Sequence, residues 1–329
     1  MRYLVIILSV LISSGAYAID YPEPSDPVAK KFVERFKQDK VLLDSPAFFE
    51  VSNTSPAWPC EIPEEEIRRI AGVGGMSSLP ADVQKKMKES YRKVGMKPPK
   101  DVEYKNLQII PIKAQCAKGK LVGDIDLIVS HDTDDESTSS QVLMGKVVHK
   151  TTVTKRRTLR RIQGSIREGK FEDMASFSQS TTQTDSHWDD ELMESKSKET
   201  NEIFNKPTPV QTVSYFNKNG EGGSFLLLMQ KEVRAGALGL GTSVKEVPQL
   251  LSTFSIPIDA HYSRTEEYTN KSLTHIRNLK DRKMHGESIF NWGNYAKENN
   301  MPPGSQEEQI KITCYQDGEE VRMSPCPSE

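Results

Sequence analysis

The stretch CAKGKLVGD at residues 116–124 contains the pattern from which the fold can be predicted. An apolar run ends there, a lysine-glycine turn follows, and a new apolar run begins. Residues 279–287 (LKDRKMHGE) have the same form, and weaker copies lie at 166–171, 215–221 and 314–321. In each copy a glycine, which adopts positive φ at little cost, separates two strand-forming runs. The repeated phrase therefore predicts β-hairpins and an antiparallel sheet.

Helices are expected only near the start of the chain. Asp26 or Ser25 can cap a helix that has Pro27 in its first turn. The apolar residues that follow recur at helical spacing and mark its buried stripe: Val28, Phe32, Val33 and Phe36. Shorter helices are expected at 64–70 and 80–95, each ended by glycine.

After residue 99 the pattern changes to short apolar or alternating runs separated by turns, which is typical of strands. The fold class predicted is α+β, mainly β, with antiparallel hairpin-built sheets, short helices at the N-terminal end and two halves. The expected strands are 107–114, 121–130, 142–154, 158–166, 210–216, 224–233, 254–259, 264–268, 273–279, 287–292, 310–314 and 320–323.

The first residues have the composition of an export signal. The run from Leu4 to Ile12 is apolar and follows basic Arg2, and Ala16-Tyr17-Ala18 forms an A-x-A cleavage site. We expect cleavage after Ala18, residence in the periplasm of a Gram-negative bacterium, and no transmembrane segment in the mature chain; an uncleaved anchor is the alternative. The expected divisions are a signal peptide (1–18), an N-terminal domain of helices and sheet (19–179), a polar linker or mobile loop (180–206) and a C-terminal antiparallel β domain (207–329).

The charges argue against nucleic acid as a partner. The 44 basic and 46 acidic residues give a formal net charge of −2, whereas nucleic-acid-binding domains are strongly basic. The four cysteines all follow the signal, and an even number in an exported chain predicts two disulfides. Of the three pairings we favour Cys60–Cys116 and Cys314–Cys326, which join neighbours in sequence. No cysteine or histidine spacing predicts a metal site.

An acidic segment, HDTDDESTSS at 131–140, is expected to form a polar loop between two strands. Its carboxylates can attract a basic partner, and we name them as candidate partner-binding residues: Asp132, Asp134, Asp135 and Glu136. Calcium binding is an alternative, but Ser137 stands where an EF-hand-like loop needs glycine. A solvated charged loop is the third interpretation.

A basic segment, KRRTLRR at 155–161, is the densest positive run of the chain. As a strand it would direct alternate residues to opposite faces, with Arg157 and Arg161 on one and Arg156 and Arg160 on the other. These four arginines are the second set of candidate partner-binding residues, suited to acidic side chains or an anionic lipid surface. An exposed strand kept soluble by its charge is the alternative.

No catalytic signature is present in the sequence, whether G-x-S-x-G, H-E-x-x-H or a P-loop. Gly236 to Gly241 is glycine-rich but lacks the strand-turn-helix setting of a dinucleotide site. His187 and the carboxylates at 189–191 could support acid–base chemistry. They fall in the polar segment 180–206, however, where fixed geometry is not expected. We therefore expect no enzyme activity and no cofactor.

Two of the turn phrases carry a family resemblance. Residues 215–220, in which Tyr215-Phe216 precede Asn219-Gly220, and residues 283–290 (KMHGESIF) resemble degenerate MORN-type repeats. That family builds stacked hairpins from aromatic-x-x-x-Gly and His-Gly phrases, so the resemblance implies hairpins in these positions. The copies here are irregularly spaced, whereas a repeat array keeps its period.

The chain also resembles, in overall type, periplasmic immunity proteins that neutralise type VI secretion phospholipase effectors. The shared features are a signal peptide, a disulfide-held β-rich body, charged loops and the lack of a catalytic motif. The first hypothesis is thus an exported, non-catalytic binding protein whose partner is a secreted toxin. The alternatives are an envelope enzyme or ligand-binding protein using the His187 segment or the acidic loop, and a structural subunit of an envelope machine.

Overall fold

The structure is a computed structural model of the chain. It describes residues 19–50, 57–74, 81–93, 103–143, 145–195, 208–235, 242–299, 301, 309–322 and 325–327. The predicted signal peptide (1–18) and the glycine-rich segment 236–241 lie outside the described residues.

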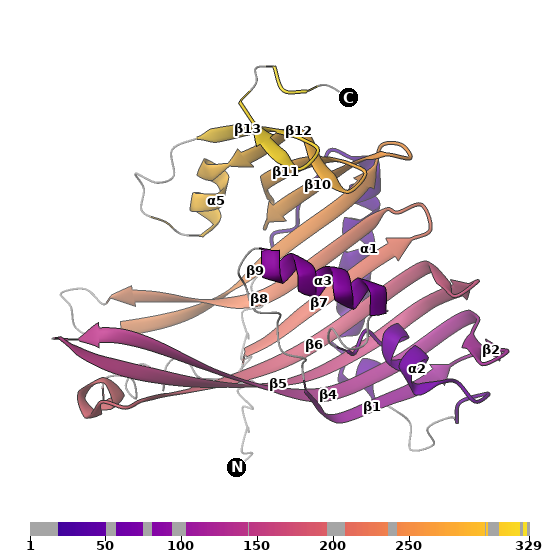
Figure 1. The fold of residues 1–329 in the computed structure, drawn as a ribbon, viewed down its shortest axis with the longest axis horizontal. Coiled ribbons are helices and arrows are strands. Elements are labelled where there is room, and N and C mark those ends of the chain that lie inside the picture. Colours follow the sequence, from indigo (N-terminus) through magenta and orange to yellow (C-terminus); the bar gives the residue numbers. More distant parts are fainter. Residues whose placement is uncertain are drawn as a thin grey trace, which may run out of the picture.

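One large antiparallel sheet forms the frame of the molecule (Figure 1). In the described part of the chain its twelve strands follow the order β1-β4-β5-β6-β7-β8-β9-β10-β11-β12-β13-β14, and β2 and β3 form a separate small ribbon. The strands are β1 (Tyr104–Lys113), β2 (Cys116–Ala117), β3 (Lys120–Leu121), β4 (Gly123–Leu143), β5 (Lys146–Arg167), β6 (Lys170–Trp188), β7 (Thr208–Asn217), β8 (Gly222–Ala235), β9 (Thr242–Pro257), β10 (Tyr262–Thr269), β11 (Ser272–Lys280), β12 (Lys283–Asn291), β13 (Ile310–Gln316) and β14 (Glu319–Val321).

The helices gather mainly at the N-terminal end of the chain, which confirms the predicted α+β, mainly β class. In Figure 1, α1 lies behind the sheet, whereas α2 and α3 lie in front of it. The helices are α1 (Pro27–Leu43), the 3-10 helix η1 (Pro46–Phe49), α2 (Glu64–Ile70), α3 (Ala81–Lys93) and, near the C-terminus, α5 (Trp292–Glu298).

The hairpin turns are formed by the residues that the sequence indicated. Lys118–Gly119, Glu168–Gly169 and Asp317–Gly318 each join two adjacent strands, and both residues of every pair have positive φ. Positive φ at both central residues is the type I′ geometry, whose twist matches that of the strands it connects. The repeated phrase thus predicted these hairpins for the correct physical reason.

The copy at 279–287 differs from the prediction. Its turn lies at Asp281–Arg282, both with positive φ, and not at the glycine. Gly286, at φ 74°, lies inside β12, where the β11–β12 register shifts between Arg277 and Leu279. A glycine with positive φ inside a strand is typical of a bulge, so Gly286 permits a bend of the sheet.

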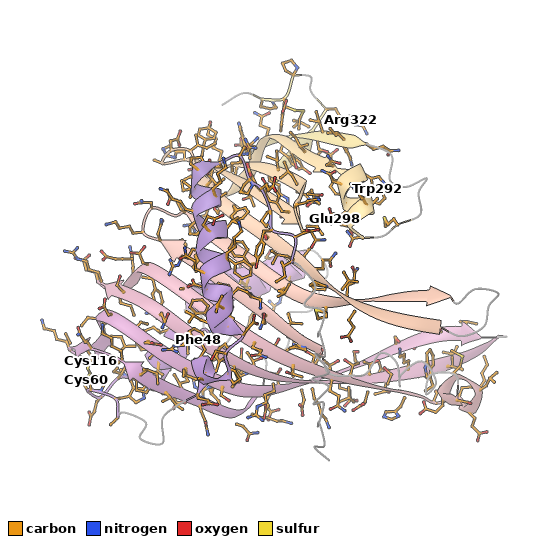
Figure 2. All side chains as sticks on the ribbon, turned by 180° about the vertical axis from the view of Figure 1, so that it is seen from behind. Phe48, Cys60, Cys116, Trp292, Glu298 and Arg322 are labelled. Atoms are coloured by element: carbon orange, nitrogen blue, oxygen red, sulfur yellow. A yellow bond between two sulfur atoms is a disulfide. The ribbon has the colours of Figure 1, made fainter. Side chains whose placement is uncertain are left out.

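The two faces of the sheet carry two separate hydrophobic cores, because successive side chains of a strand point to opposite faces. On β6, Phe177 belongs to the core beneath α1, whereas Met174 packs on the core beneath α2. We call the two surfaces the α1 face and the α2 face. Figures 1 and 2 view the molecule from opposite sides, with α2 nearer in the first and α1 nearer in the second.

The α1 face has an aromatic core centred on Phe225. The ring of Phe36, on α1, stacks on Phe225 with 4.3 Å between ring centroids, and Phe254 and Tyr215 meet Phe225 edge-on. Asp26 caps α1 as predicted, since its carboxylate accepts hydrogen bonds from two backbone N–H groups of the first turn. The helix is therefore fixed both at its start and along its buried stripe.

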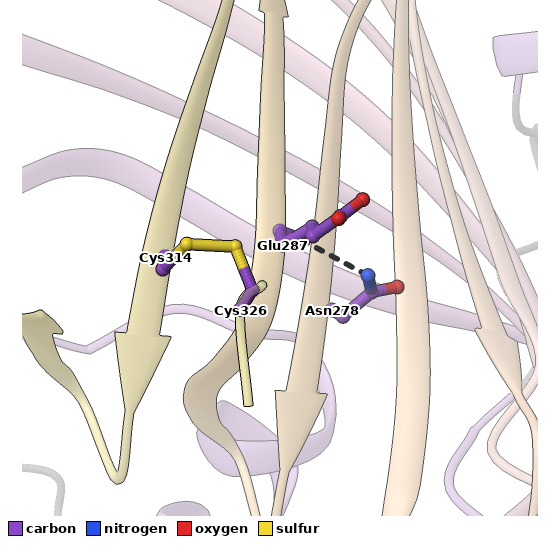
Figure 3. The surroundings of a disulfide bond; sticks show 4 residues. All are labelled: Asn278, Glu287, Cys314 and Cys326. Atoms are coloured by element: carbon purple, nitrogen blue, oxygen red, sulfur yellow. Dashed lines mark hydrogen bonds between the residues drawn. A yellow bond between two sulfur atoms is a disulfide. The ribbon is translucent and has the colours of Figure 1, made fainter. Parts of the chain in front are cut away.

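Both predicted disulfides are confirmed. Cys60–Cys116 joins the segment before α2 to β2, at one end of the sheet (Figure 2). Cys314–Cys326 fastens the C-terminal segment to β13, beside β12 (Figure 3). Each bridge holds a segment of little regular structure against the sheet.

The segment 180–206 is only partly the linker or loop that its polarity indicated. Strand β6 continues to Trp188, and a short helical turn follows at 191–195. Residues 196–207 lie outside the described residues. The sheet passes from β6 to β7 without interruption, pairing Asp173 with Asn217 through Thr182 with Thr208. The division of the chain into two domains stays a prediction.

Candidate functional site

The predicted acidic loop is a strand, so that prediction was wrong. All 21 residues of β4 pair one to one with β5, from Gly123↔Ile166 to Leu143↔Lys146, without a register shift. The acidic segment lies directly beside the basic segment, with Asp132 opposite Arg157 and Asp134 opposite Lys155. Opposite charges across an antiparallel pair contribute about 0.2–1 kcal/mol each, which favours a strand despite the aspartates.

Strands β4, β5 and β6 extend beyond their neighbours on either side. Within the described residues, the pairing of β1 with β4 ends at Tyr104↔Thr133, and that of β7 with β6 ends at Thr182↔Thr208. Residues 134–143, 146–155 and 183–188 therefore form a three-stranded extension, which we call the arm. In Figure 1 the arm reaches to the left, away from the body of the sheet.

The arm carries its charges on both faces. Asp134, Glu136 and Lys155 point to the α1 face, whereas Asp135 and Arg156 point to the α2 face, because alternation and register fix the side of each residue. All five side chains belong to exposed residues. These charges are thus accessible on both faces of the arm, and they do not form one acidic and one basic surface.

Lys105 of β1 anchors the base of the arm, although the sequence gave no reason to select it. Its Nζ lies 2.8 Å from Oδ2 of Asp134. The hydrogen bond from Lys105 lowers the pKa of the Asp134 carboxyl, and the same bond raises the pKa of Lys105. Asn106 donates in the same way to Asp132, at 2.7 Å. Two of the four predicted carboxylates are therefore held in fixed positions.

Arg161 serves the chain's own packing. Its guanidinium donates to both carboxylate oxygens of Asp126, at 2.9 and 2.7 Å, and to the carbonyl of Phe48 at 2.8 Å. The guanidinium also lies 4.6 Å from the centre of the Phe48 ring. Arg161 thus ties η1, which contains Phe48, to the α1 face, and its donors are engaged within the molecule.

Arg160 has the equivalent position on the α2 face. Its Nη1 lies 3.3 and 3.5 Å from the carbonyls of Ala71 and Gly72, at the C-terminal end of α2. Carbonyls at the end of a helix carry partial negative charge, which suits a guanidinium. Of the four predicted arginines, Arg156 and Arg157 remain exposed, and Arg160 and Arg161 pack against helices.

His131 lies at the base of the arm, buried on the α2 face. The ring of Tyr104 meets it edge-on at 4.9 Å, and its Nδ1 has no hydrogen-bond partner among the described residues. Burial is the main cause that lowers the pKa of His131, and the nearby Arg160 acts in the same direction. The surroundings of the imidazole therefore favour its neutral form over the protonated form.

A pH dependence of stability follows from this burial. The unfolded chain, with a histidine pKa of about 6.5, binds the proton more readily than the folded chain, so stability present above about pH 6.5 is lost as the pH falls. As the pH falls from neutral toward the folded-state pKa of His131, we expect the free energy of unfolding of a His131→Gln variant to decrease less steeply than that of the unaltered chain. Urea titrations at several pH values test this. The pKa of His275 is also lowered, so only the difference between the two proteins reports on His131; parallel curves would contradict the assignment.

The tip of the arm exposes apolar side chains that the sequence prediction did not select. Val142 and Val147 face each other across β4 and β5 on the α1 face, with exposed fractions of 73% and 53%. Both valines fall within the expected strand 142–154, and their sequence positions alone do not distinguish them from buried strand residues. Their position where β4 and β5 extend past every other described strand leaves them without cover.

The His187 segment, the alternative site, lies where β6 ends on the arm, on the side of the tip. Asp189 makes two hydrogen bonds with the backbone of His149: its N–H donates to the His149 carbonyl, and its side-chain carboxylate accepts from the His149 N–H. Asp190 accepts from the N–H groups of Leu192 and Met193 and so caps the helical turn. His187 itself is exposed, 3.5 Å from Glu194. These carboxylates stabilise the end of β6, which is a structural role.

Among the described residues, no group of three or more histidine, cysteine, aspartate or glutamate side chains is arranged to hold a metal ion. In β4 the successive carboxylates Asp134 and Asp135 point to opposite faces, so they cannot share a calcium ion. In the part of the chain that the structure describes, no helix has the length and apolar character needed to span a membrane.

Comparison of the chain with protein-family models, with curated proteins and with solved structures finds no match.

Proposed function

We propose that this chain is an exported, non-catalytic binding protein that uses the arm to bind a protein partner, most concretely a toxic effector that it neutralises in the periplasm. The observation that carries the proposal is the arm itself, a three-stranded ribbon with exposed charges and an exposed apolar tip. The specific partner class, a type VI secretion phospholipase, comes from the resemblance in overall type.

The stiffness of the arm supports a binding role. The unbroken register of β4 and β5 holds the backbone in one conformation over the whole length of both strands. Lys105 and Asn106 fix the carboxylates at its base. A surface already in its bound conformation loses less conformational entropy on association, which favours affinity. The ion pair of Lys105 with Asp134 also orients the Asp134 carboxylate before a partner binds.

The exposed apolar side chains at the tip of the arm supply binding energy that the charges alone do not. Binding energy in protein interfaces is concentrated in a few apolar or aromatic anchors, while surrounding charges steer the encounter and select the partner. Val142 and Val147 form such an apolar pair, and the charges of Asp135, Glu136 and Arg156 follow along the ribbon. The arrangement suits insertion of the tip into a cleft of a partner, such as the active site of an enzyme.

The test uses the mature chain and the toxin encoded beside its gene. We expect the two proteins to bind, and the double variant Val142→Asp/Val147→Lys to bind at least about tenfold more weakly, since burying the two new charges in the interface costs more than about 1.4 kcal/mol. The two new charges lie opposite each other, so the hairpin is preserved. Biolayer interferometry gives both rate constants, and the association rate should fall as salt rises.

Ile310 and Ile312 provide a matched control. Both are exposed β-branched residues, on β13 at a distance from the arm. The variant Ile310→Asp/Ile312→Lys should bind as the unaltered chain does. Equal binding by the tip variant would remove the arm from the proposal, and failure of the unaltered chain to bind or to protect cells from that toxin would reject the immunity function.

A further inference from the structure

A second surface, distinct from the arm, lies at the opposite end of the same strands. The turns that connect β5 to β6 and β7 to β8 border a hollow of about 750 Å³, closed on one side by α2. Its volume falls in the range of small-molecule sites, about 300–1,000 Å³. Strand β5 has 22 residues, so the hollow and the tip of the arm are separated by roughly 70 Å at about 3.3 Å per residue.

The floor of the hollow is apolar. Met174 and Phe216 are direct cross-strand partners on the α2 face, and Phe171 lies beside them on β6. Met174 and Phe171 pack against the core beneath α2, so the floor is continuous with that core. Phe216 remains 43% exposed, an unusual state for a phenylalanine within a strand.

The rim of the hollow is cationic, and no carboxylate of the described residues pairs with the ammonium groups of Lys170 and Lys218 that line it. Arg69 is bound by both oxygens of Glu66, and Arg167 lies 3.7 Å from Glu172. Among the described residues, neither Lys170 nor Lys218 forms an ion pair, although both line the hollow.

Glu168, in the β5–β6 turn, is the remaining lining carboxylate, and no ion pair engages it in the described part of the chain. The charged groups of the lining without an ion-pair partner among the described residues are therefore two ammonium groups and one carboxylate. The hollow is therefore positive at its rim and apolar on its floor, and a ligand that matches it must combine an anionic group with an apolar body.

We infer that this hollow binds a single-chain anionic amphiphile, such as a fatty acid. Lys170 and Lys218 would receive the anionic head as charge-assisted hydrogen-bond donors. The acyl chain would lie along Phe171, Met174 and Phe216 and would remove their exposed surface from water. This inference does not rest on the protein-binding role of the arm.

The test titrates the mature chain with three probes by isothermal calorimetry, each below its micelle concentration. Laurate carries both the anion and the chain, dodecyl maltoside carries the chain without charge, and acetate carries the anion without the chain. We expect saturable binding of laurate at one site per chain, at least tenfold weaker binding of the maltoside, and no heat from acetate. The double variant Lys170→Glu/Lys218→Glu and the single variant Phe216→Ser should each weaken laurate binding at least tenfold.

The control variant is Lys283→Glu/Lys311→Glu, which reverses two exposed charges on β12 and β13 and should bind laurate normally. Laurate binding that is unchanged in the Lys170→Glu/Lys218→Glu variant would overturn the inference. Equal affinities for laurate and dodecyl maltoside would also overturn it, because they indicate a neutral apolar surface. The same holds if anionic vesicles bind while laurate does not. Loss of toxin binding by the arm variant leaves all of these outcomes unaffected, so the two proposals fail separately.

Discussion

Replacing Phe225 with alanine is expected to lower the free energy of unfolding by about 3–5 kcal/mol, the usual cost of emptying a core phenylalanine site. The side chain is fully buried at the centre of the α1 face, in contact with rings from α1, β7 and β9. Its neighbours are aromatic and belong to different elements, so they cannot collapse into the space together. The variant therefore loses the free energy of transferring the ring from water to the core, and the cavity that remains destabilises the folded state further.

Urea unfolding followed by circular dichroism measures this loss. Phe216→Ala is the matched control, because it removes the same side chain from the next strand at a partly exposed position, and we expect a loss of less than about 1 kcal/mol. Similar losses for the two variants would mean that Phe225 is not the centre of a tightly packed core.

Removing the Cys60–Cys116 bridge is expected to cost about 4 kcal/mol, and removing Cys314–Cys326 about 3 kcal/mol, from the chain-entropy relation for loops of different length. The bridges span 56 and 12 residues respectively. The longer loop restricts the unfolded chain more, so its release gains more entropy. The Cys60–Cys116 bridge also connects α2 with the strands on which it packs.

The comparison uses the double variants Cys60→Ser/Cys116→Ser and Cys314→Ser/Cys326→Ser, each measured by denaturant titration under non-reducing conditions. The order of the two losses is the decisive result. If the loss of the C-terminal bridge costs more, native-state contacts around β13 dominate over the entropy of the unfolded chain.

The hairpins could be predicted from the sequence, whereas the arm could not. A turn such as Glu168–Gly169 depends on the φ preferences of the residues that form it, so local sequence suffices. The acidic segment depends on its neighbour across the sheet. Aspartates are poor strand formers, and only the register that sets Asp132 against Arg157 explains why β4 continues through them.

The candidate site shows the same limit. Eight charged residues were predicted from the sequence to bind a partner. In the structure two of them, Arg160 and Arg161, instead form hydrogen bonds with carbonyls at α2 and η1. No local pattern indicates that these helices dock beside the arginines. Val142 and Val147 could not be selected either, because their exposure depends on where the neighbouring strands end.

The order of strands has a consequence for how the chain folds. From β5 to β14 each strand pairs with the one that precedes it in the chain, so the sheet can grow strand by strand from its N-terminal side, with low contact order. Helix α1 is the exception. It precedes every described strand, yet it packs on β7, β8 and β9, which lie in the second half of the chain. Helix α1 can therefore dock only after the strands in the middle of the sheet have formed. Its docking on Phe225 completes the contacts between residues far apart in the sequence.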